Sequence, residues 1–296
     1  MSTQRFPVTN TVVVTGASSG IGEACALHLD QLGFRVFAGV RREIDGEALQ
    51  CKASNKLTSI LLDVTDTVSI TSTMEKVTKA VGENGLAGLI NNAGIAVAGP
   101  LEFLPITEMR KQFEVNVLGQ IAVTQAFLPL IRQGRGRVIN IGSLGGRIAM
   151  PFIGPYCAAK FSMEALTDAL RLELRPWHIP VSIIEPGFIA TPIWEKSREV
   201  ADVTFKNLPK EANHLYGMVI PSVRETYAQM GKTGTPVEEV VKVIVHALTS
   251  TRPKARYIVG RGSWLGTVLL ERLPAQLRDL ILVRWLIKRS SKSIQQ

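Results

Sequence analysis

The sequence contains few cysteines, few aromatic residues and no long uninterrupted hydrophobic run. Of its 296 residues only three are cysteines, and Cys25, Cys51 and Cys157 are far apart, with no CxxC or His pairing. This pattern excludes a disulfide scaffold, gives no sign of a structural metal and favours a reducing compartment. No apolar stretch approaches the roughly 20 residues needed to span a bilayer. The N-terminus also lacks the apolar core of an export signal, so a cytoplasmic location is expected.

The composition is that of a globular protein with a sizeable core. Hydrophobic residues make up 46% of the chain and charged residues 20%, which excludes the disordered and collagen-like classes. Domains of α/β type often reach roughly 250 residues. We therefore expect a single main domain over residues 1–262, followed by a tail over residues 263–296.

The positive charge of the chain is concentrated at its C-terminal end. The formal net charge is +9, and residues 252–296 contain ten Lys or Arg against two acids. Leucines and the tryptophans Trp264 and Trp285 are interspersed with these basic residues. Such a segment is typical of a peripheral membrane contact or a partner-binding helix rather than of nucleic-acid binding. The alternative is a C-terminal helix packed on the body with its arginines in water, and the sequence leaves both open.

Short runs of β-branched residues alternate with segments of helical spacing. The runs predict strands at 11–15, 35–40, 58–62, 86–91, 137–141, 181–185 and 257–259, and the segments between them predict helices at 20–32, 44–53, 66–82, 107–132, 156–177 and 236–249. This alternation predicts an α/β fold, a doubly wound parallel sheet of about seven strands with helices on both faces and a C-terminal helical tail. Residues 192–230 interrupt the pattern with three prolines and no clear strand, so we expect a substrate lid there.

The first predicted strand runs into a glycine-rich turn that opens a helix. Its spacing is G-x-x-x-G-x-G rather than the commoner G-x-G-x-x-G. Glycines let the backbone turn sharply and approach a pyrophosphate, and the helix N-terminus offers free N–H groups. A purely structural turn is the alternative, but the position between the first strand and a helix favours dinucleotide binding. The predicted cofactor contacts are Gly16, Ser18, Ser19, Gly20, Ile21 and Gly22.

Two arginines, Arg41 and Arg42, end the second predicted strand, where an acid would accept a hydrogen bond from the adenosine 2′-hydroxyl. A guanidinium instead suits a 2′-phosphate, so the sequence favours NADP(H) over NAD(H). The alternative is a pair of solvated loop charges. After the third predicted strand, Asp63 and Val64 are expected at the adenine edge, unless Asp63 caps a helix.

A tyrosine and a lysine, Tyr156 and Lys160, are four residues apart on a predicted helix and hence on one face of it. A phenol has a pKa near about 10, and a nearby cation lowers it by roughly 1–3 units, so Tyr156 is expected to exchange a proton near neutral pH. Ser143 follows the strand predicted at 137–141, where its hydroxyl is expected to hydrogen-bond a substrate carbonyl beside the tyrosine. By itself, a Tyr–Lys pair at this spacing occurs by chance in many helices.

The order of the motifs resembles the classical short-chain dehydrogenase/reductase family over about residues 10–260; the matching elements are the glycine turn, Asn91-Asn92-Ala93-Gly94, Asn116, Ser143, Tyr156, Lys160, Pro186-Gly187 and Thr191. The resemblance implies an NAD(P)-dependent oxidoreductase with a Rossmann-type sheet, assembled as a homodimer or homotetramer. It also implies a catalytic tetrad of Asn116, Ser143, Tyr156 and Lys160, in which Asn116 bends its helix and holds a water. Further cofactor contacts that it implies are Asn92, Ala93, Gly94, Tyr156, Lys160, Pro186, Gly187, Ile189 and Thr191.

Within that family, other stretches are similar to the hydroxysteroid, retinol and 3-hydroxybutyrate dehydrogenases, namely residues 36–40, 127–132, 137–141 and 185–187 and the late Arg256-Tyr257 with the Trp/Leu-rich tail. Arg41 looks like the basic residue of the NADP-preferring hydroxysteroid enzymes. The resemblance therefore implies interconversion of a lipophilic ketone or aldehyde and its alcohol.

The expected substrate pocket is apolar and is bordered by Leu144, Met150, Phe152, Ile153, Phe188, Trp194, Tyr216 and Met218, with Ser143 and Tyr156 at the reacting carbonyl. Ordinary core or lid packing explains the same apolar side chains. Two other functions stay open: a 3-oxoacyl-thioester reductase, and a non-catalytic NADP-binding adaptor that uses its tail to bind a membrane or partner.

Overall fold

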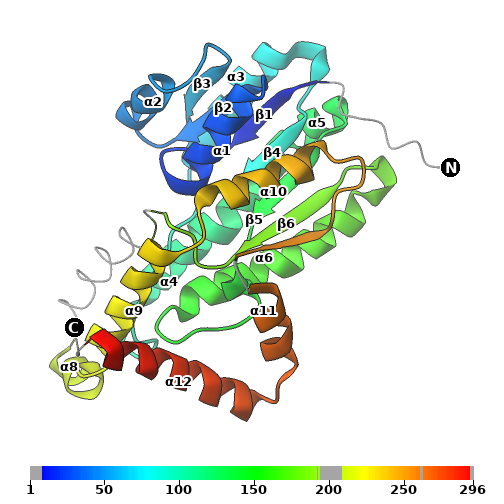
Figure 1. Cartoon of the computed structure of the whole chain (residues 1–296). Helices are drawn as coiled ribbons and strands as arrows, with labels where there is room; N and C mark the ends of the chain where they lie inside the picture. The colour runs from blue at the N-terminus through cyan, green and yellow to red at the C-terminus, as the bar shows by residue number, and fades with distance from the viewer. Residues whose placement is uncertain (1–8, 192, 194–208, 261–262, 294–296) are drawn as a thin grey trace.

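The computed structural model describes residues 9–191, 193, 209–260 and 263–293 (Figure 1). Seven parallel strands form one sheet in the order β3-β2-β1-β4-β5-β6-β7. The strands are β1 (Thr11–Val14), β2 (Arg35–Val40), β3 (Leu57–Leu61), β4 (Gly88–Asn91), β5 (Arg137–Ile141), β6 (Val181–Pro186) and β7 (Arg256–Val259). The predicted doubly wound parallel sheet is therefore confirmed.

Helices connect the strands and cover both faces of the sheet. Those within the main domain are α1 (Gly20–Gln31), α2 (Glu43–Gln50), α3 (Thr67–Val81), α4 (Ile106–Phe113), α5 (Gly119–Gly134), α6 (Gly154–Glu173), α8 (Lys210–Tyr216), α9 (Ile220–Thr233) and α10 (Val237–Thr249). Two more, α11 (Ser263–Arg272) and α12 (Ala275–Ser293), form the tail.

The core consists of two apolar layers, one on each face of the sheet. Along β1, Val12 and Val14 pack into the layer that includes α1 and α10, whereas Val13 packs into the layer that includes α3 and α5. All three valines are fully buried. A strand with apolar residues on both faces lies inside a sheet covered on both sides, which explains why these strands have continuous rather than alternating hydrophobic sequences.

The helix predicted at 107–132 is interrupted. A π-helical turn at Glu114–Leu118 separates α4 from α5 and includes the fully buried Asn116. The extra residue in such a turn shifts the side chains that follow relative to a regular helix, and π-turns are frequent at functional sites. By length and composition alone the whole segment Ile106–Gly134 is able to cross a membrane, although half of its apolar window is buried in the body.

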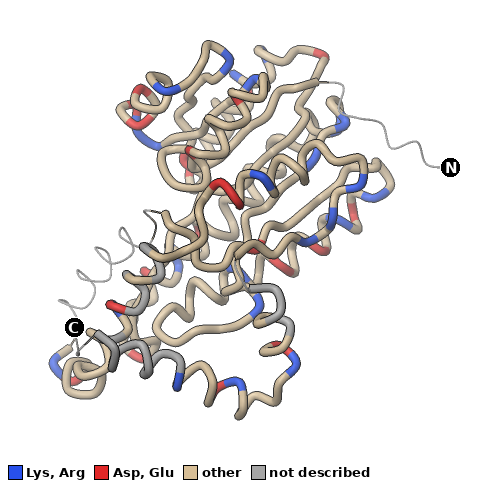
Figure 2. The backbone as a smooth tube through the Cα atoms, viewed as in Figure 1, with Lys and Arg blue, Asp and Glu red and all other residues tan. Residues whose placement is uncertain are grey.

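The tail packs against the main domain. One end of α12 contacts α9, and α11, which follows β7 in the chain, contacts that strand (Figure 1). Basic residues recur along the described part of the tail (Figure 2), and Arg272 and Arg284 are exposed. Part of the expected lid region, 192–230, lies outside the described residues, and its described part forms α8 and α9.

Candidate active site

One cleft opens at the carboxyl ends of β1, β4, β5 and β6, where the order of the strands reverses between β1 and β4. This switch point is where open α/β sheets bind their ligands. The cleft is lined by Ile21, Asn92, Gly94, Ile95, Asn116, Ile141, Gly142, Ser143, Tyr156, Lys160, Pro186, Gly187, Ile189, Thr191 and Ile193. It thus brings together predicted residues from the glycine turn, the tetrad and the segment after β6.

The glycine turn is locked to the end of β4 by hydrogen bonds. The Asn92 amide donates to the carbonyls of Thr15 and Gly16, both at 3.0 Å, and Thr15 Oγ1 accepts from the backbone N–H groups of Asn92 and Ala93 at 2.9 Å. A Cβ at Gly22 would lie 2.2 Å from the Gly16 oxygen, and Gly16 itself has φ +65°. Only glycine fits both positions, which keeps a short path from β1 to the N-terminus of α1.

The predicted catalytic side chains meet on the other wall of the cleft. Ser143 lies two residues after the end of β5, and its hydroxyl accepts from the Gly145 N–H at 3.0 Å and lies beside the Tyr156 ring. Tyr156 and Lys160 lie one turn apart on α6, with Lys160 Nζ 5.8 Å from the centre of the phenol ring. Lys160 Nζ also donates to the Ile141 carbonyl at 2.6 Å, so the end of β5 fixes the lysine as well as the serine.

The electrostatics of this group differ from the expectation. Burial raises the pKa of Tyr156 to about 12, and the hydrogen bond from Ser143 lowers it only in part. Burial also lowers the pKa of Lys160 to about 8. The predicted lowering of the phenol pKa is therefore wrong for the protein alone, because desolvation of the phenolate outweighs the contribution of Ser143.

Asn116 is held in the π-helical turn by backbone contacts. Its Nδ2 donates to the Ile95 carbonyl, and its Oδ1 accepts from the Ile95 N–H, both at 2.9 Å. These two bonds fix the segment after β4 to the helix. The expected bend at Asn116 takes the form of this π-turn, and the side chain lines the cleft.

The comparisons with known proteins agree with this arrangement. Residues 10–202 match the short chain dehydrogenase family. The chain belongs to the short-chain dehydrogenase family. Among its relatives, retinol dehydrogenase 5 of Mus musculus is 37% identical, over 98% of this chain and 93% of the relative. The 17-beta-hydroxysteroid dehydrogenase type 6 of Bos taurus is 38% identical (92% and 87% covered), and the NADPH-dependent 3-dehydrocapnine reductase of Ornithobacterium rhinotracheale is 35% identical (95% and 99% covered).

This short-chain dehydrogenase is therefore an oxidoreductase, as the sequence predicts, and it resembles the hydroxysteroid- and retinol-dehydrogenase subgroup. The family binds a nicotinamide cofactor, and the residues present fit one. The glycine turn leaves no room for side chains between Gly22 and Gly16, and the cleft beside it holds a buried lysine and a buried phenol.

The two arginines predicted to read the ribose differ in their surroundings. Arg42 is tied to Asp45 through two hydrogen bonds of 2.8 and 2.6 Å, whereas Arg41 is exposed and makes no polar contact with any described residue. Asp63 Oδ1 accepts from the N–H and hydroxyl of Thr65, and it is Asp66 that caps α3. The capping alternative for Asp63 is therefore wrong. Val64 is buried beneath the π-turn helix, where its carbonyl faces Gly119.

An apolar cluster lies next to the cleft and shares Tyr156 with it. Phe188, Phe152 and Met150 pack around Ile153, Tyr156 and Cys157 in one cluster. Tyr216 contacts Phe152 edge-on, at 6.1 Å between ring centres. Met218 is 94% exposed, and its predicted place in the pocket stays a prediction. Leu144 lies half-buried in the 3₁₀ turn after Ser143, and Trp194 lies outside the described residues.

Sequence reasoning missed Ile95, Ile141, Gly142 and Ile193, which also line the cleft. Gly142 and Ile141 precede Ser143 directly, so their position next to a candidate catalytic residue was a usable signal. Ile95 gave no such signal, because it bonds to Asn116 through its backbone atoms.

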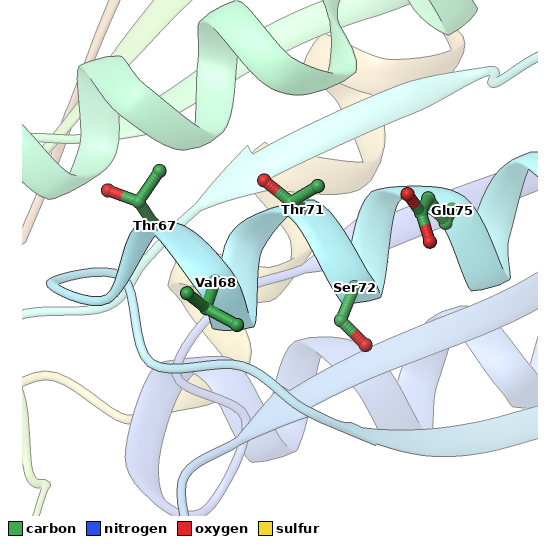
Figure 3. Close-up of a pocket in the computed structure, with 5 residues that line it drawn as sticks. All are labelled: Thr67, Val68, Thr71, Ser72 and Glu75. Carbon is green, nitrogen blue, oxygen red and sulfur yellow. The ribbon is translucent and has the colours of Figure 1, made fainter.

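A second hollow, along the outer side of α3 (Figure 3), is lined by Thr67, Val68, Thr71, Ser72 and Glu75. These side chains all come from one helix and include no acid–base pair.

Proposed function

We propose that this protein uses NADP(H) to interconvert a lipophilic ketone or aldehyde and its alcohol, with Tyr156 as the general acid and base. The observation that carries the proposal is the position of Ser143 and Tyr156, which both line the glycine-turn cleft, while Tyr156 also packs in the apolar cluster with Phe152 and Phe188. Such a position sets a reacting carbonyl against both a proton donor and a cofactor site. The relatives named for retinol and 17-beta-hydroxysteroid support a lipophilic substrate.

The mechanism divides the work among three side chains, and bound NADPH supplies the hydride for the carbonyl carbon. Tyr156 is the proton donor to the carbonyl oxygen, and its raised pKa keeps it protonated until that oxygen becomes basic. Ser143 Oγ accepts from the Gly145 N–H, and its single proton would turn from the phenol to the substrate oxygen when substrate is bound. The Lys160 ammonium, buried beside the phenol, stabilises the phenolate that remains.

The cofactor preference is proposed to depend on Arg41. Its guanidinium is exposed, has no polar partner among the described residues and suits a 2′-phosphate, whereas Arg42 already binds a carboxylate. Replacing Arg41→Ser should raise the KM for NADPH by roughly tenfold or more and change the KM for NADH little, because charge-assisted hydrogen bonds contribute about 1.5–3 kcal/mol. The control is Arg42→Ser, with an expected effect of less than about threefold. Equal losses for both cofactors in Arg41→Ser would show that the arginine does not read the 2′-phosphate.

The reaction is tested by the initial rates of NADPH and NADH consumption with retinal, ketosteroids, simple ketones and acetoacetyl thioesters. We expect a lipophilic ketone or aldehyde to be reduced fastest, and with NADPH preferred. A thioester as the preferred substrate would instead assign the protein as a 3-oxoacyl-thioester reductase. Tight NADPH binding with no turnover of any carbonyl would support the adaptor alternative.

The tail is proposed to make a peripheral membrane contact. Its described helices expose Leu269, Leu277, Leu280, Ile281 and Val283 together with the basic Arg272 and Arg284. Apolar and basic side chains exposed on one segment suit an anionic lipid surface, on which a lipophilic substrate would also be dissolved. The purified protein should float with vesicles containing phosphatidylserine at low salt, and Leu277→Asp with Ile281→Asp should abolish flotation. If the protein with both substitutions still floats with the vesicles, the tail does not make the membrane contact.

We further propose that two copies associate through α6. This helix exposes the apolar side chains of Phe161, Leu166 and Leu172, which a second copy would cover. Sedimentation equilibrium of the purified protein should give at least a dimer, and a monomer at micromolar concentration would contradict the proposal.

A further inference from the structure

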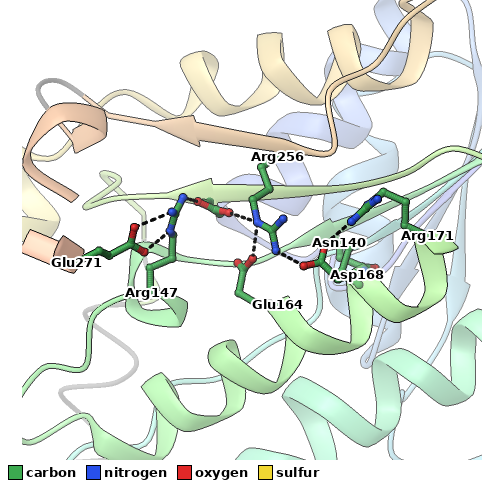
Figure 4. Close-up of polar contacts among 9 residues, drawn as sticks. Asn140, Arg147, Glu164, Asp168, Arg171, Arg256 and Glu271 are labelled. Carbon is green, nitrogen blue, oxygen red and sulfur yellow. Dashed lines mark hydrogen bonds and ion pairs between the residues drawn. The ribbon is translucent and has the colours of Figure 1, made fainter. Parts of the chain in front are cut away.

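An ion network lies beside the cleft and is not used by the mechanism above (Figure 4). At its centre, Arg147 contacts two carboxylates from opposite directions. Its Nε and Nη2 bind the two oxygens of Glu271 on α11, at 2.5 and 2.7 Å, and its Nη1 binds Glu185 on β6 at 3.0 Å. Arg147 thus joins the C-terminal tail to the central sheet, across 124 residues of sequence on one side and 38 on the other.

Arg147 closes the turn that carries Ser143. Its N–H donates to the Leu144 carbonyl at 3.0 Å, and the Gly145 N–H in the same turn donates to Ser143 Oγ. The turn also lies directly on the backbone of Lys160, since a Cβ at Gly146 would come within 2.9 Å of the Lys160 carbonyl oxygen. A shift of Arg147 therefore moves the turn that places Ser143 against Tyr156 and Lys160.

The second contact of Arg147 fixes the end of β6. Glu185 is fully buried and directly precedes Pro186 and Gly187, which line the cleft. Its other oxygen lies 3.3 Å from Arg256 Nε. A buried carboxylate is tolerated only when cations or hydrogen bonds compensate for its lost hydration. Arg147 and Arg256 thus fix the position of the carboxyl end of β6 beside the cleft.

Glu271 determines where the Arg147 guanidinium points. A carboxylate that binds two nitrogens of one guanidinium fixes both its position and its plane. With Nε and Nη2 held by Glu271, Nη1 is left facing Glu185. Side-chain exposure at this contact is low, 22% for Arg147 and 26% for Glu271, so water competes with it less than at an open surface pair.

We propose that Arg147 is a positioning residue for the hydride transfer, and that Glu271 of the C-terminal tail holds it in place. The tail then has a role in turnover that does not depend on any membrane contact. Removal of the Glu271 charge releases the guanidinium, loosens the Ser143 turn and the Pro186–Gly187 segment together, and lowers the rate of the chemical step. The inference rests on the proposed function only for its kinetic consequence.

The test compares Glu271→Gln with Glu239→Gln in the full-length protein. Glu239 also pairs with a cation, Lys242 at 2.7 Å, but on the exposed face of α10. We expect Glu271→Gln to lower kcat roughly tenfold at saturating NADPH, with KM for NADPH within about twofold, as loss of one charge-assisted contact implies. The control should retain wild-type kcat. Unchanged kcat in Glu271→Gln, or a rise in KM alone, would overturn the proposal.

A measurement on the protein without cofactor or substrate tests the role of Arg147 and Glu271 separately from the proposed function. In hydrogen–deuterium exchange, the amides of residues 143–148 and 184–189 should exchange at least about fivefold faster in Glu271→Gln than in the control. If the wild-type protein reduces no carbonyl, the proposed function fails, while faster exchange in both segments still supports the structural link. Exchange unchanged in both segments would overturn the link itself.

Arg147→Lys gives a second check, since lysine keeps the charge but lacks the planar fork. We expect kcat of Arg147→Lys to lie between that of the wild type and that of Arg147→Met. Equal kcat values for the lysine and methionine variants and the wild type would overturn the positioning role.

Discussion

Replacing Tyr156→Phe is expected to reduce kcat for carbonyl reduction by about 10²- to 10⁴-fold, the contribution usual for a general acid. The change removes one oxygen from a side chain that is otherwise packed among Ile153, Cys157 and Phe188, so the apolar cluster stays filled. It leaves Ser143 with its bond from the Gly145 N–H. The loss should therefore fall on the chemical step, with the affinity for NADPH within about threefold of wild type.

A matched control for the tyrosine is Tyr257→Phe. Tyr257 is also buried, its hydroxyl accepts from the Lys254 N–H at 2.8 Å and contacts His246, and it is not among the residues that line the cleft. Its loss should cost about 1 kcal/mol of stability, as for one neutral hydrogen bond, and leave kcat unchanged. If Tyr156→Phe kept more than about a tenth of the wild-type kcat, Tyr156 would not be the proton donor.

The second large effect is expected from Lys160→Met, which should abolish most turnover and yet stabilise the fold. Methionine fills much the same apolar volume without a charge. Burial lowers the pKa of Lys160 from 10.5 to about 8, so the fold bears the cost of a desolvated cation at neutral pH. After subtracting about 1 kcal/mol for the lost bond to the Ile141 carbonyl, we expect a net gain of about 2 kcal/mol in the free energy of unfolding at pH 7.

The pH dependence of that gain follows from the direction of the shift. Because the unfolded chain binds the lysine proton more tightly than the folded one, the penalty is complete below about pH 8 and fades as the pH rises towards 10.5. Urea unfolding of Lys160→Met at pH 7 and pH 10 measures this, with Lys52→Met, an exposed lysine paired with Glu23, as the control. If Lys160→Met were less stable than the wild type at pH 7, other interactions in the fold would have to offset the desolvation cost of the ammonium.

The sequence predicted most of the fold and the core of the candidate site for identifiable reasons. Strands such as β1 are buried on both faces, so their sequences are continuously apolar and their positions are easily found. The glycine turn could be predicted because its fold requires glycine at fixed positions. A Cβ at Gly16 or Gly22 would lie within 3 Å of backbone atoms. Tyr156 and Lys160 were placed together by helical spacing alone.

Other features depended on three-dimensional surroundings that periodicity does not carry. The sequence brings Tyr156 and Lys160 together, but it does not show how deeply both are buried, so the direction of the Tyr156 pKa was predicted wrongly. It also does not show that Arg42 is paired with Asp45, whereas Arg41 has no polar partner in the part of the chain that the structure describes. The contact between Arg147 and Glu271 joins residues 124 positions apart, and nothing in either local sequence indicates it.

The central claim is that the cleft transfers a hydride from NADPH to a lipophilic carbonyl. It is tested most directly with NADPH deuterated at the transferring position of nicotinamide C4, incubated with the wild-type protein and the best ketone or aldehyde of the panel. Mass spectrometry of the alcohol should show one deuterium on the former carbonyl carbon, and Tyr156→Phe should form little of it. An alcohol without deuterium, or no alcohol from any lipophilic carbonyl, would contradict the account.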